Sequence, residues 1–293
     1  MSKEFITNRM IRGFVLLRYI IFPLLAYSLY SLLIQPYNVW HILLLFVCLF
    51  SLWGSFIESQ ILLVRHTVID VGFSARIALI ADLHLGPLKG EKFLRRVVRR
   101  INQLSVDYVL VAGDWTYEPR IRDLERLFKP LKDLKFPTFG VLGNHDVERP
   151  GPKLREKLVK LLESYGVRML HNEIVPLTNF TLVGLGDHWI GEDDSRILEQ
   201  IPEDQNTLVL MHNPDSIDGF PRPVSKGLSV AGHTHGGQIR IPFYKKLIPV
   251  KGNYHHGLTH EPNGKLFITS GIGETAVNVR FLRPPRIDVL ELV

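Results

Sequence analysis

Cysteine is almost absent from this chain, since Cys48 is the only one among 293 residues. A single thiol excludes a disulfide framework within the chain and a zinc site built from cysteine thiolates. Internal repeats and low-complexity linkers are absent as well. Formal charge is missing from one long stretch, because Arg18 is the only charged residue between residues 13 and 57. Such a stretch is not typical of soluble sequence, so we expect a membrane segment, residues 1–57, and one globular domain, residues 58–293.

The positive charge of the chain is modest and unevenly placed. The net charge of +6 comes from 35 Lys and Arg residues against 29 Asp and Glu residues. Half of this excess precedes residue 58 and comes from Lys3, Glu4, Arg9, Arg12 and Arg18. The remaining domain therefore lacks the strongly basic character of nucleic-acid binders, and we expect no nucleic-acid partner.

Two apolar runs fill the membrane segment. They cover residues 13–33 and 39–57, and each is close to the roughly 20 residues that a helix needs to cross a bilayer. The connection contains Pro36, which breaks a helix, and Asn38, a common turn residue. This pattern predicts a transmembrane helical hairpin. A cleaved signal peptide or a buried pair of helices is the alternative, but no small-residue cleavage site follows and the runs are too long.

Basic residues around the two runs predict the orientation of the hairpin. Three precede the first run and two follow the second: Lys3, Arg9, Arg12, Arg65 and Arg76. The connection between the runs carries no charge, so both termini and the domain are expected to face the cytoplasm. Arg18 and Pro23 weaken the first run, although Arg18 lies near its edge and could reach the headgroups.

Short runs rich in Val, Ile and Leu recur after residue 58, and most have the length of buried strands. They cover residues 61–69, 75–81, 107–113, 136–143, 180–186, 206–212, 227–232 and 265–271. Two segments between them, residues 92–104 and 153–165, place apolar side chains at helical spacing. The alternation of strands and helices predicts a layered α/β domain that becomes richer in strands toward the C-terminus.

Five of these runs end directly in side chains that can bind a metal ion. The clusters are Asp82-Leu83-His84, Gly113-Asp114, Gly143-Asn144-His145-Asp146, His212-Asn213 and Gly232-His233-Thr234-His235. One such residue at a strand end is usually part of a turn, but five clusters in one chain are hard to explain in that way. Loops at the carboxyl ends of strands converge on one crevice. Carboxylate, amide and imidazole ligands without thiolate suit Mn, Fe or Zn, and two such ions suit an anionic phosphate substrate.

The motifs DLH, GD, GNHD, H and GHTH, in this order, resemble those of the calcineurin-like metallophosphoesterase superfamily. The segments 211–215, 232–239, 271–273 and 280–285 resemble its membrane-associated bacterial phosphodiesterase branch, which includes a UDP-diacylglucosamine pyrophosphohydrolase of lipid A synthesis. The resemblance covers the domain from about residue 60 onward. It implies a layered β-sandwich flanked by helices, a bacterial inner-membrane location and two divalent ions, with manganese as first choice and iron or zinc as alternatives.

The resemblance also implies individual roles. The first ion would be held by Asp82, His84 and His235, the second by Asn144, His212 and His233, and Asp114 would bridge both. His145 would be catalytic, stabilising charge on the phosphoryl group or protonating the leaving oxygen. Asp146 would either orient His145 or hold a turn. Trp115 and Tyr117, where many members carry a small or acidic residue, would shape the wall that faces the substrate.

These features predict a membrane-anchored di-metal hydrolase of a phosphodiester or pyrophosphate bond. Its partners would be the lipid bilayer and a lipid-linked phosphate substrate, with a UDP-diacylglucosamine lipid A precursor as the specific candidate. A phosphodiesterase for soluble substrates is one alternative, and a metal-binding regulatory protein without activity is another, although the intact ligand set argues against it. Basic residues in 92–104 and 240–251 would either contact anionic headgroups or form ordinary solvated and packed surfaces. The oligomeric state stays open.

Overall fold

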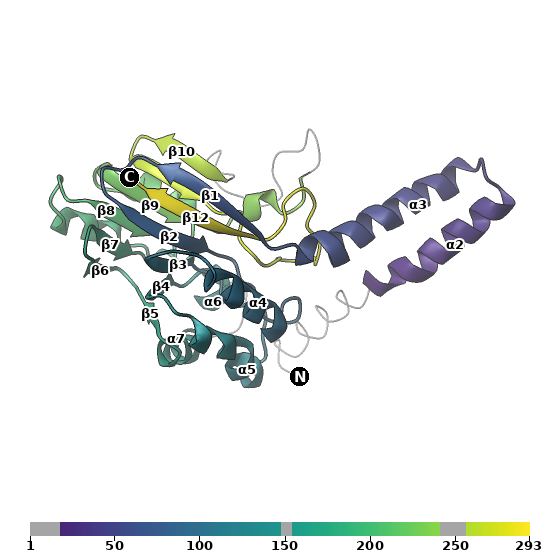
Figure 1. Ribbon diagram of the computed structural model, residues 1–293, viewed down its shortest axis with the longest axis horizontal. Helices are drawn as coiled ribbons and strands as arrows, with labels where there is room; N and C mark the ends of the chain where they lie inside the picture. The colour runs from purple at the N-terminus through teal and green to yellow at the C-terminus, as the bar shows by residue number, and fades with distance from the viewer. Residues whose placement is uncertain (1–17, 148–153, 241–255) are drawn as a thin grey trace.

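The computed structural model describes residues 18–147, 154–240 and 256–293. Figure 1 shows two parts, a pair of long helices that extends to one side and a layered domain that contains both sheets.

The two helices form an antiparallel hairpin. A short 3-10 helix (Arg18–Ile20) leads into α2 (Ile21–Ile34), and α3 (Val39–Leu52) continues through a π-helical turn (Trp53–Ile57) and a 3-10 turn (Glu58–Gln60). Asn38 begins α3, because its side chain accepts hydrogen bonds from the backbone N–H groups of Trp40 and His41. By length and composition, Val39–Gln60 could cross a membrane, whereas Arg18–Ile34 is a shorter apolar helix. The first predicted run begins outside the described residues.

The first sheet contains the amino-terminal strands of the domain and its last strand. Its described strands are ordered β1 (Leu63–Ile69), β12 (Arg286–Leu292), β2 (Ala75–Ile80), β3 (Tyr108–Ala112), β4 (Thr138–Val141) and β5 (Val167–Met169). Strands β2 to β5 are parallel, and β12 runs antiparallel to β2 and parallel to β1. The carboxyl ends of β2, β3 and β4 therefore share one edge.

The second sheet has a similar mixed construction. Its described strands are ordered β10 (Gly257–Glu261), β11 (Gly264–Ile268), β9 (Val224–Ala231), β8 (Thr207–Leu210), β7 (Thr181–Gly184) and β6 (Glu173–Pro176). The four central strands are parallel, while β10 and β6 pair antiparallel at the edges.

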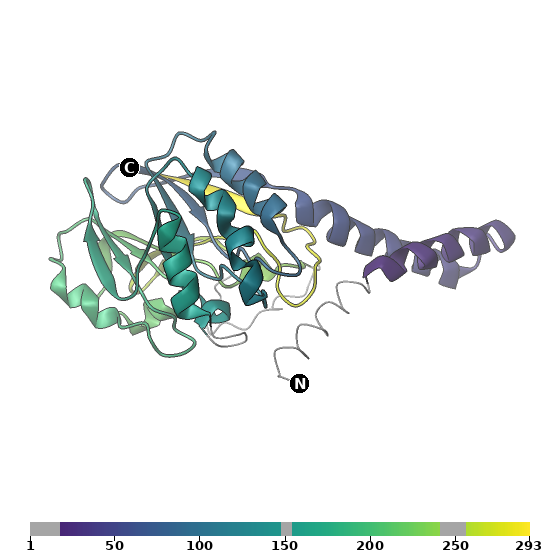
Figure 2. The same ribbon diagram turned by 90° about the horizontal axis from the view of Figure 1, so that it is seen from below.

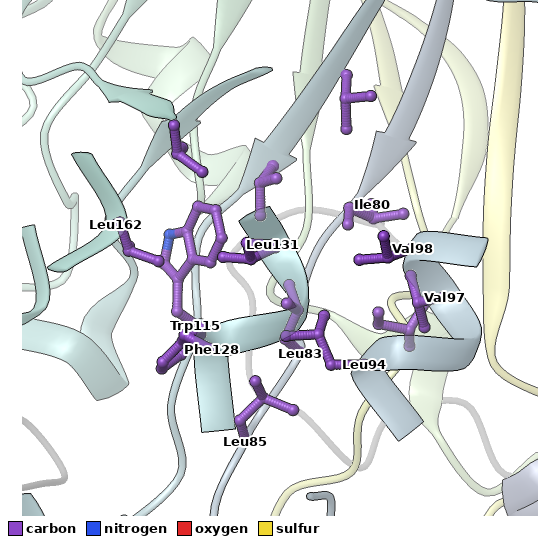
Figure 3. Packing of buried hydrophobic residues seen from close by; sticks show 14 of the residues in the cluster. Ile80, Leu83, Leu85, Leu94, Val97, Val98, Trp115, Phe128, Leu131 and Leu162 are labelled. Atoms are coloured by element: carbon purple, nitrogen blue, oxygen red, sulfur yellow. The ribbon is translucent and has the colours of Figure 1, made fainter. Parts of the chain in front are cut away.

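The sheets pack face to face through fully buried aliphatic side chains, among them Leu79, Leu110, Leu182, Leu208 and Leu228. Three helices cover the outer face of the first sheet: α4 (Glu91–Ile101), α5 (Leu124–Phe128) and α7 (Arg155–Ser164), as Figure 2 shows. Figure 3 shows Val97 and Val98 of α4 packed toward Ile80 of β2. The predicted layered α/β fold with helices outside the sheets is confirmed.

Candidate metal centre

The predicted ligands lie together, although they are far apart in the sequence. Each follows a parallel strand, and the carboxyl ends of these strands meet at one edge of the sandwich. Two trios of potential ligand atoms, each within 4.8 Å, consist of predicted ligands alone: Asp82, His84 and His235, and Asp114, His212 and His233. A third trio within the same distance contains His84, Asp114 and His145.

Asp114 belongs to the second trio and also contacts the first. Its Oδ2 atom is 3.5 Å from Nε2 of His84 and 3.3 Å from Nε2 of His212. Asn144 joins the second trio, since its Oδ1 atom lies 3.1 Å from the same His212 nitrogen. The structure thus brings all seven predicted ligands into one buried cluster, with the predicted bridging carboxylate at its centre.

Backbone carbonyl groups orient two of the imidazoles. Nδ1 of His212 lies 2.8 Å from the carbonyl oxygen of Ala112, and Nδ1 of His84 lies 3.3 Å from that of Thr116. Each Nδ1 therefore donates its proton to a carbonyl, and each Nε2 offers its lone pair to the cluster. This arrangement is typical of histidines that bind metal ions.

The backbone at the site adopts a conformation that most residues avoid. Five of the predicted ligands have a positive φ: Asp82 (52°), His84 (46°), Asp114 (52°), His233 (68°) and His235 (51°). Such left-handed geometry is uncommon outside glycine and concentrates at functional sites. The glycines of the motifs allow close approach, since a Cβ at Gly143 would overlap the carboxylate of Asp114. The GD and GNHD motifs therefore specify backbone geometry as well as ligands.

Electrostatics keep most of the imidazoles neutral. Burial lowers the pKa of His84 and of His233 to about 3, and it lowers the pKa of His235 well below its usual range. Burial also disfavours charge on His212, yet the carboxylates of Asp114 and Asp82 raise its pKa to about 10. Neutral imidazole is the form that binds metals, and the carboxylates that attract a proton to His212 would attract a divalent cation equally well.

These residues fit a pair of metal ions. Nε2 atoms of His84 and His235 face one another at 3.0 Å, although both are placed to offer lone pairs. Oδ2 of Asp82, Nε2 of His233 and Nδ1 of His235 are buried without a hydrogen-bond partner among the described residues. Buried polar atoms are otherwise almost always satisfied. A cation bound by Nε2 of His84 and Nε2 of His235 would remove the repulsion between their two lone pairs, and the same cation would bind the carboxylate of Asp82.

His145 and Tyr117 border the cluster. The His145 ring lies 4.9 Å from the ring of His84 and 5.2 Å from that of Tyr117, and its backbone N–H donates to Oδ1 of Asp114. Tyr117 also contacts His84, at 5.5 Å between ring centroids. Tyr117, one of the two residues predicted to shape the substrate wall, therefore lies beside the cluster.

Trp115 does not form this wall, and that prediction was wrong. Its side chain is fully buried and its Nε1 donates to the carbonyl of Val141 at 2.8 Å. Figure 3 shows its indole in the hydrophobic core near Phe128 and Leu162. The reason is that the chain does not continue as a regular strand after β3, because Asp114 has a positive φ and a bend follows at Tyr117. The alternation that would place positions 115 and 117 on the same face is therefore lost, and Trp115 lies in the core while Tyr117 lies beside the site.

Asp146 holds the turn that follows β4. Among the described residues, its carboxylate binds backbone N–H groups and a hydroxyl and not the imidazole of His145. Its Oδ2 accepts hydrogen bonds from the backbone N–H groups of Trp115 and Gly143, at 3.1 and 3.0 Å. Its Oδ1 accepts from the backbone N–H and the hydroxyl of Thr116, at 3.0 and 2.8 Å. This carboxylate therefore fastens the loop after β3, which carries Asp114, to the loop after β4, which carries Asn144.

One acidic residue near the site was missed. Asp187 follows β7 and is buried, and its Oδ2 has no hydrogen-bond partner among the described residues. Burial raises the pKa of Asp187 to about 6. The positive charge of His212 opposes this rise, and the negative charge of Asp114 adds to it. The signal was present in the sequence, because Asp187 ends the apolar run 180–186 in the same way that the five clusters end theirs. Nearby Trp189 lies 5.4 Å from His233 between ring centroids.

Comparison with known proteins agrees with this geometry. The family model for calcineurin-like phosphoesterases matches residues 75–289. An uncharacterized metallophosphoesterase of Helicobacter pylori is 33% identical over 227 residues, which cover 74% of this chain and 60% of that protein. Phosphodiesterase YaeI of Escherichia coli is 30% identical over 249 residues, covering 79% of this chain and 88% of that protein.

A further relative carries a more specific name. UDP-2,3-diacylglucosamine pyrophosphatase LpxG of Chlamydia muridarum is 25% identical over 273 residues, covering 73% of this chain and 82% of that protein. The chain spans about 60% of the length of the Helicobacter pylori relatives. With its matched family model and its relatives, the chain belongs to the calcineurin-like phosphoesterase family.

Proposed function

We propose that this protein is a membrane-anchored di-metal hydrolase that cleaves a phosphodiester or pyrophosphate bond in a lipid-linked substrate, such as a UDP-diacylglucosamine. In this proposal residues 1–57 anchor the chain and residues 58–293 form the catalytic domain on the cytoplasmic side. The observation that carries the chemistry is the pair of ligand trios that meet at one carboxylate, Asp114.

The proposed roles follow from position in the cluster. Asp82, His84 and His235 would hold one ion, Asn144, His212 and His233 the other, and Asp114 would contact both. Two divalent ions, with manganese as first choice, would polarise a phosphoryl oxygen and lower the pKa of the attacking water. His145 lies at the edge of the cluster beside Tyr117. Its imidazole would donate a proton to the leaving oxygen or a hydrogen bond to the phosphoryl group.

The lipid-linked substrate is supported by the hairpin and by surface charge next to it. Exposed apolar side chains cover α2 and α3 along their length, including Leu33, Trp40 and Phe46. The basic face of α4 begins where the hairpin ends, because a guanidinium N–H of Arg96 donates to the carbonyl of Gln60 at 2.7 Å. Apolar helices followed by basic residues match the order of hydrocarbon and anionic headgroups in a bilayer. The basic segment 240–251, which was also expected to contact headgroups or to form an ordinary packed surface, lies outside the described residues, apart from Arg240.

A phosphodiesterase for soluble substrates is the second candidate. It is favoured by the likeness to phosphodiesterase YaeI, which is higher in identity than the likeness to LpxG. The two candidates share the metal centre and differ only in what binds beside it.

The experiment uses the full chain in detergent, stripped with a chelator and reloaded separately with Mn, Fe(II) or Zn. It measures kcat/KM for a UDP-diacylglucosamine and for bis(p-nitrophenyl) phosphate. We expect cleavage of both, with a clear preference for the lipid. The absence of hydrolysis with every metal would contradict the enzyme, and a preference for the soluble diester would favour the second candidate.

Two variants separate chemistry from metal binding. His145→Ala should lower kcat by about 10²–10⁴-fold, the usual contribution of a general acid, while the metal content stays near two ions per chain. Asp114→Ala should lose both activity and bound metal, because it removes the oxygen shared by the two trios. Loss of metal from His145→Ala would contradict the role assigned to that imidazole.

A further inference from the structure

One loop of the domain connects the metal cluster to the hairpin. This loop, residues 274–283, follows Gly273, whose N–H donates to the carbonyl of Asp82 at 2.6 Å. The hydroxyl of Tyr117 accepts from the N–H of Ala276 at 3.2 Å, and the Tyr117 ring contacts both His84 and His145. The loop therefore borders the cluster on the side of the first trio.

A second side of the same loop is fixed to the segment that carries His235. The side chain of Gln238 accepts from the N–H of Thr275 at 2.9 Å and donates to the carbonyls of Thr275 and Val277, at 3.0 and 3.1 Å. Gln238 is buried, and its backbone N–H donates to the carbonyl of His235 at 3.0 Å. The loop thus has a fixed place relative to the predicted ligands.

The far side of the loop contacts the hairpin. The ring of Phe281 packs on that of Phe50 in α3, with 4.2 Å between centroids. The N–H of Arg280 donates to the carbonyl of Gly54 at 3.1 Å, in the π-helical turn. Figures 1 and 2 both show the segment before β12 beside the domain end of α3. A single loop therefore touches both the catalytic cluster and the apolar helix that could cross a membrane.

Apolar side chains on this loop remain exposed. Val277 is 46% exposed and Leu282 is 54% exposed, and Trp53 in the adjoining helix is 43% exposed. Leu282 has a positive φ of 56° and Ala276 one of 59°. A left-handed backbone at leucine is an outlier that surrounding structure must hold in place. The exposed apolar surface of α3 thus continues through the loop to the side of Tyr117.

We propose that loop 274–283 is the acyl-chain wall of the active site. A substrate chain leaving the bilayer lies along Val277, Phe281 and Leu282, while its phosphate reaches the metal cluster beyond Tyr117. The assignment rests on the proposed lipid-linked substrate. The occupant is an acyl chain because the surface is apolar and continuous with α3.

The test compares one altered wall with one matched control in the full chain. The wall variant combines Val277→Thr and Leu282→Asn, because threonine keeps the shape of valine and asparagine tolerates a positive φ. The control combines Val68→Thr and Ile121→Asn, two exposed apolar positions away from the loop, 63% and 40% exposed. Each protein is assayed with a long-chain UDP-diacylglucosamine in mixed micelles, a short-chain analogue and bis(p-nitrophenyl) phosphate.

The wall variant should lower kcat/KM for the long-chain substrate about tenfold through KM, as the loss of partial burial of two apolar side chains would cause. The activity of the wall variant on bis(p-nitrophenyl) phosphate should equal that of wild type. The control variant should match wild type as well. An equal loss of kcat/KM on all substrates, or no loss on any of them, would contradict the assignment of loop 274–283 as the acyl-chain wall. If wild type cleaves the diester and not the lipid, the proposed lipid-linked substrate is wrong, and the acyl-chain wall that depends on it is wrong as well.

A second measurement does not depend on the variants. A UDP-diacylglucosamine with a photoreactive diazirine in one acyl chain is bound to the wild-type chain in the presence of chelator, so that no turnover occurs. After illumination, mass spectrometry should locate the adduct within residues 274–283 or in the adjoining α3. Adducts only elsewhere in the domain would overturn the proposal even if the lipid is a substrate.

Discussion

Replacement of Asp146 tests whether one buried carboxylate assembles the metal centre. Asp146→Ala leaves three backbone N–H groups, those of Gly143, Trp115 and Thr116, and one hydroxyl without their acceptor. An unsatisfied buried donor costs about 1–3 kcal/mol. The Thr116 hydroxyl also lies 3.4 Å from the carbonyl of His145 and keeps that acceptor. The loss of their acceptor by the three N–H groups alone then lowers the free energy of unfolding by about 3–9 kcal/mol, a large part of the stability of a typical domain.

The measurement is urea unfolding of the chelator-treated chain in detergent, followed by tryptophan fluorescence, so that loss of bound metal does not enter the result. Trp115 is fully buried beside the carboxylate and reports on this region. Metal content after reloading should fall as well, because Asp146 ties the loop of Asp114 to that of Asn144. Asp123→Ala, at a partly exposed ion pair, is the control and should change stability by less than about 0.5 kcal/mol. A loss below about 1 kcal/mol with unchanged metal content would refute the reasoning.

Three further predictions concern other close contacts. Gly143→Ala should lower metal affinity at least tenfold in a competition titration with a chelator, since the new Cβ overlaps Asp114; unchanged affinity would contradict the packing argument. Burial lowers the pKa of Lys89 from 10.5 to about 8. The unfolded chain then binds more protons between these values, so stability should rise as the pH increases from 8 to 10.5. This rise should vanish in Lys89→Met, and its persistence there would assign it to another group. Gly54→Ala places a Cβ 2.7 Å from Val279 and should increase proteolysis of the 274–283 loop relative to wild type; equal rates would contradict the docked loop.

The sequence predicts the metal cluster well because each ligand follows a buried strand. Apolar runs mark β2, β3, β4, β8 and β9, and the polar residues after them can only lie at the carboxyl ends. Asp82 follows β2 of the first sheet and His233 follows β9 of the second, and the face-to-face packing of the two sheets places them side by side, with the N–H of His233 donating to Oδ1 of Asp82 at 3.0 Å. Residues 151 positions apart in the chain meet in this way.

Other parts of the fold had no such signal. Strand β5 has three residues, too few to show a period, and β10 is an edge strand in which Leu258 is the only large apolar residue. The direction of Trp115 depends on where β3 ends, a boundary that a pattern locates only within a few residues. The role of Gln238 depends on contacts with the loop 274–283, and that of Arg280, within this loop, depends on a contact with Gly54. Nothing in their immediate neighbours in the sequence indicates these contacts.

The junction at Glu58 shows that the hairpin is more than a tether. This first carboxylate after the charge-free stretch is buried, not solvated. Its Oε1 accepts from the N–H of Arg283 at 2.6 Å, and its Oε2 accepts from Nε1 of Trp53 at 2.7 Å. The next residue, Ser59, offers its carbonyl to the ammonium of Lys89, which also pairs with Glu274 at 3.2 Å.

A buried charge without its partners is strongly unfavourable, so these contacts hold the helix end and the loop in one arrangement. A chain cut after residue 60 would remove the acceptor of the Arg283 N–H, one acceptor of Lys89 and the ring against which Phe281 packs. The metal ligands would all remain in such a fragment, but the wall beside Tyr117 would lose its support. Hairpin and active site are therefore one structural unit. If α3 spans a bilayer, the height of the metal centre above the membrane is fixed by the fold and not by the length of a linker.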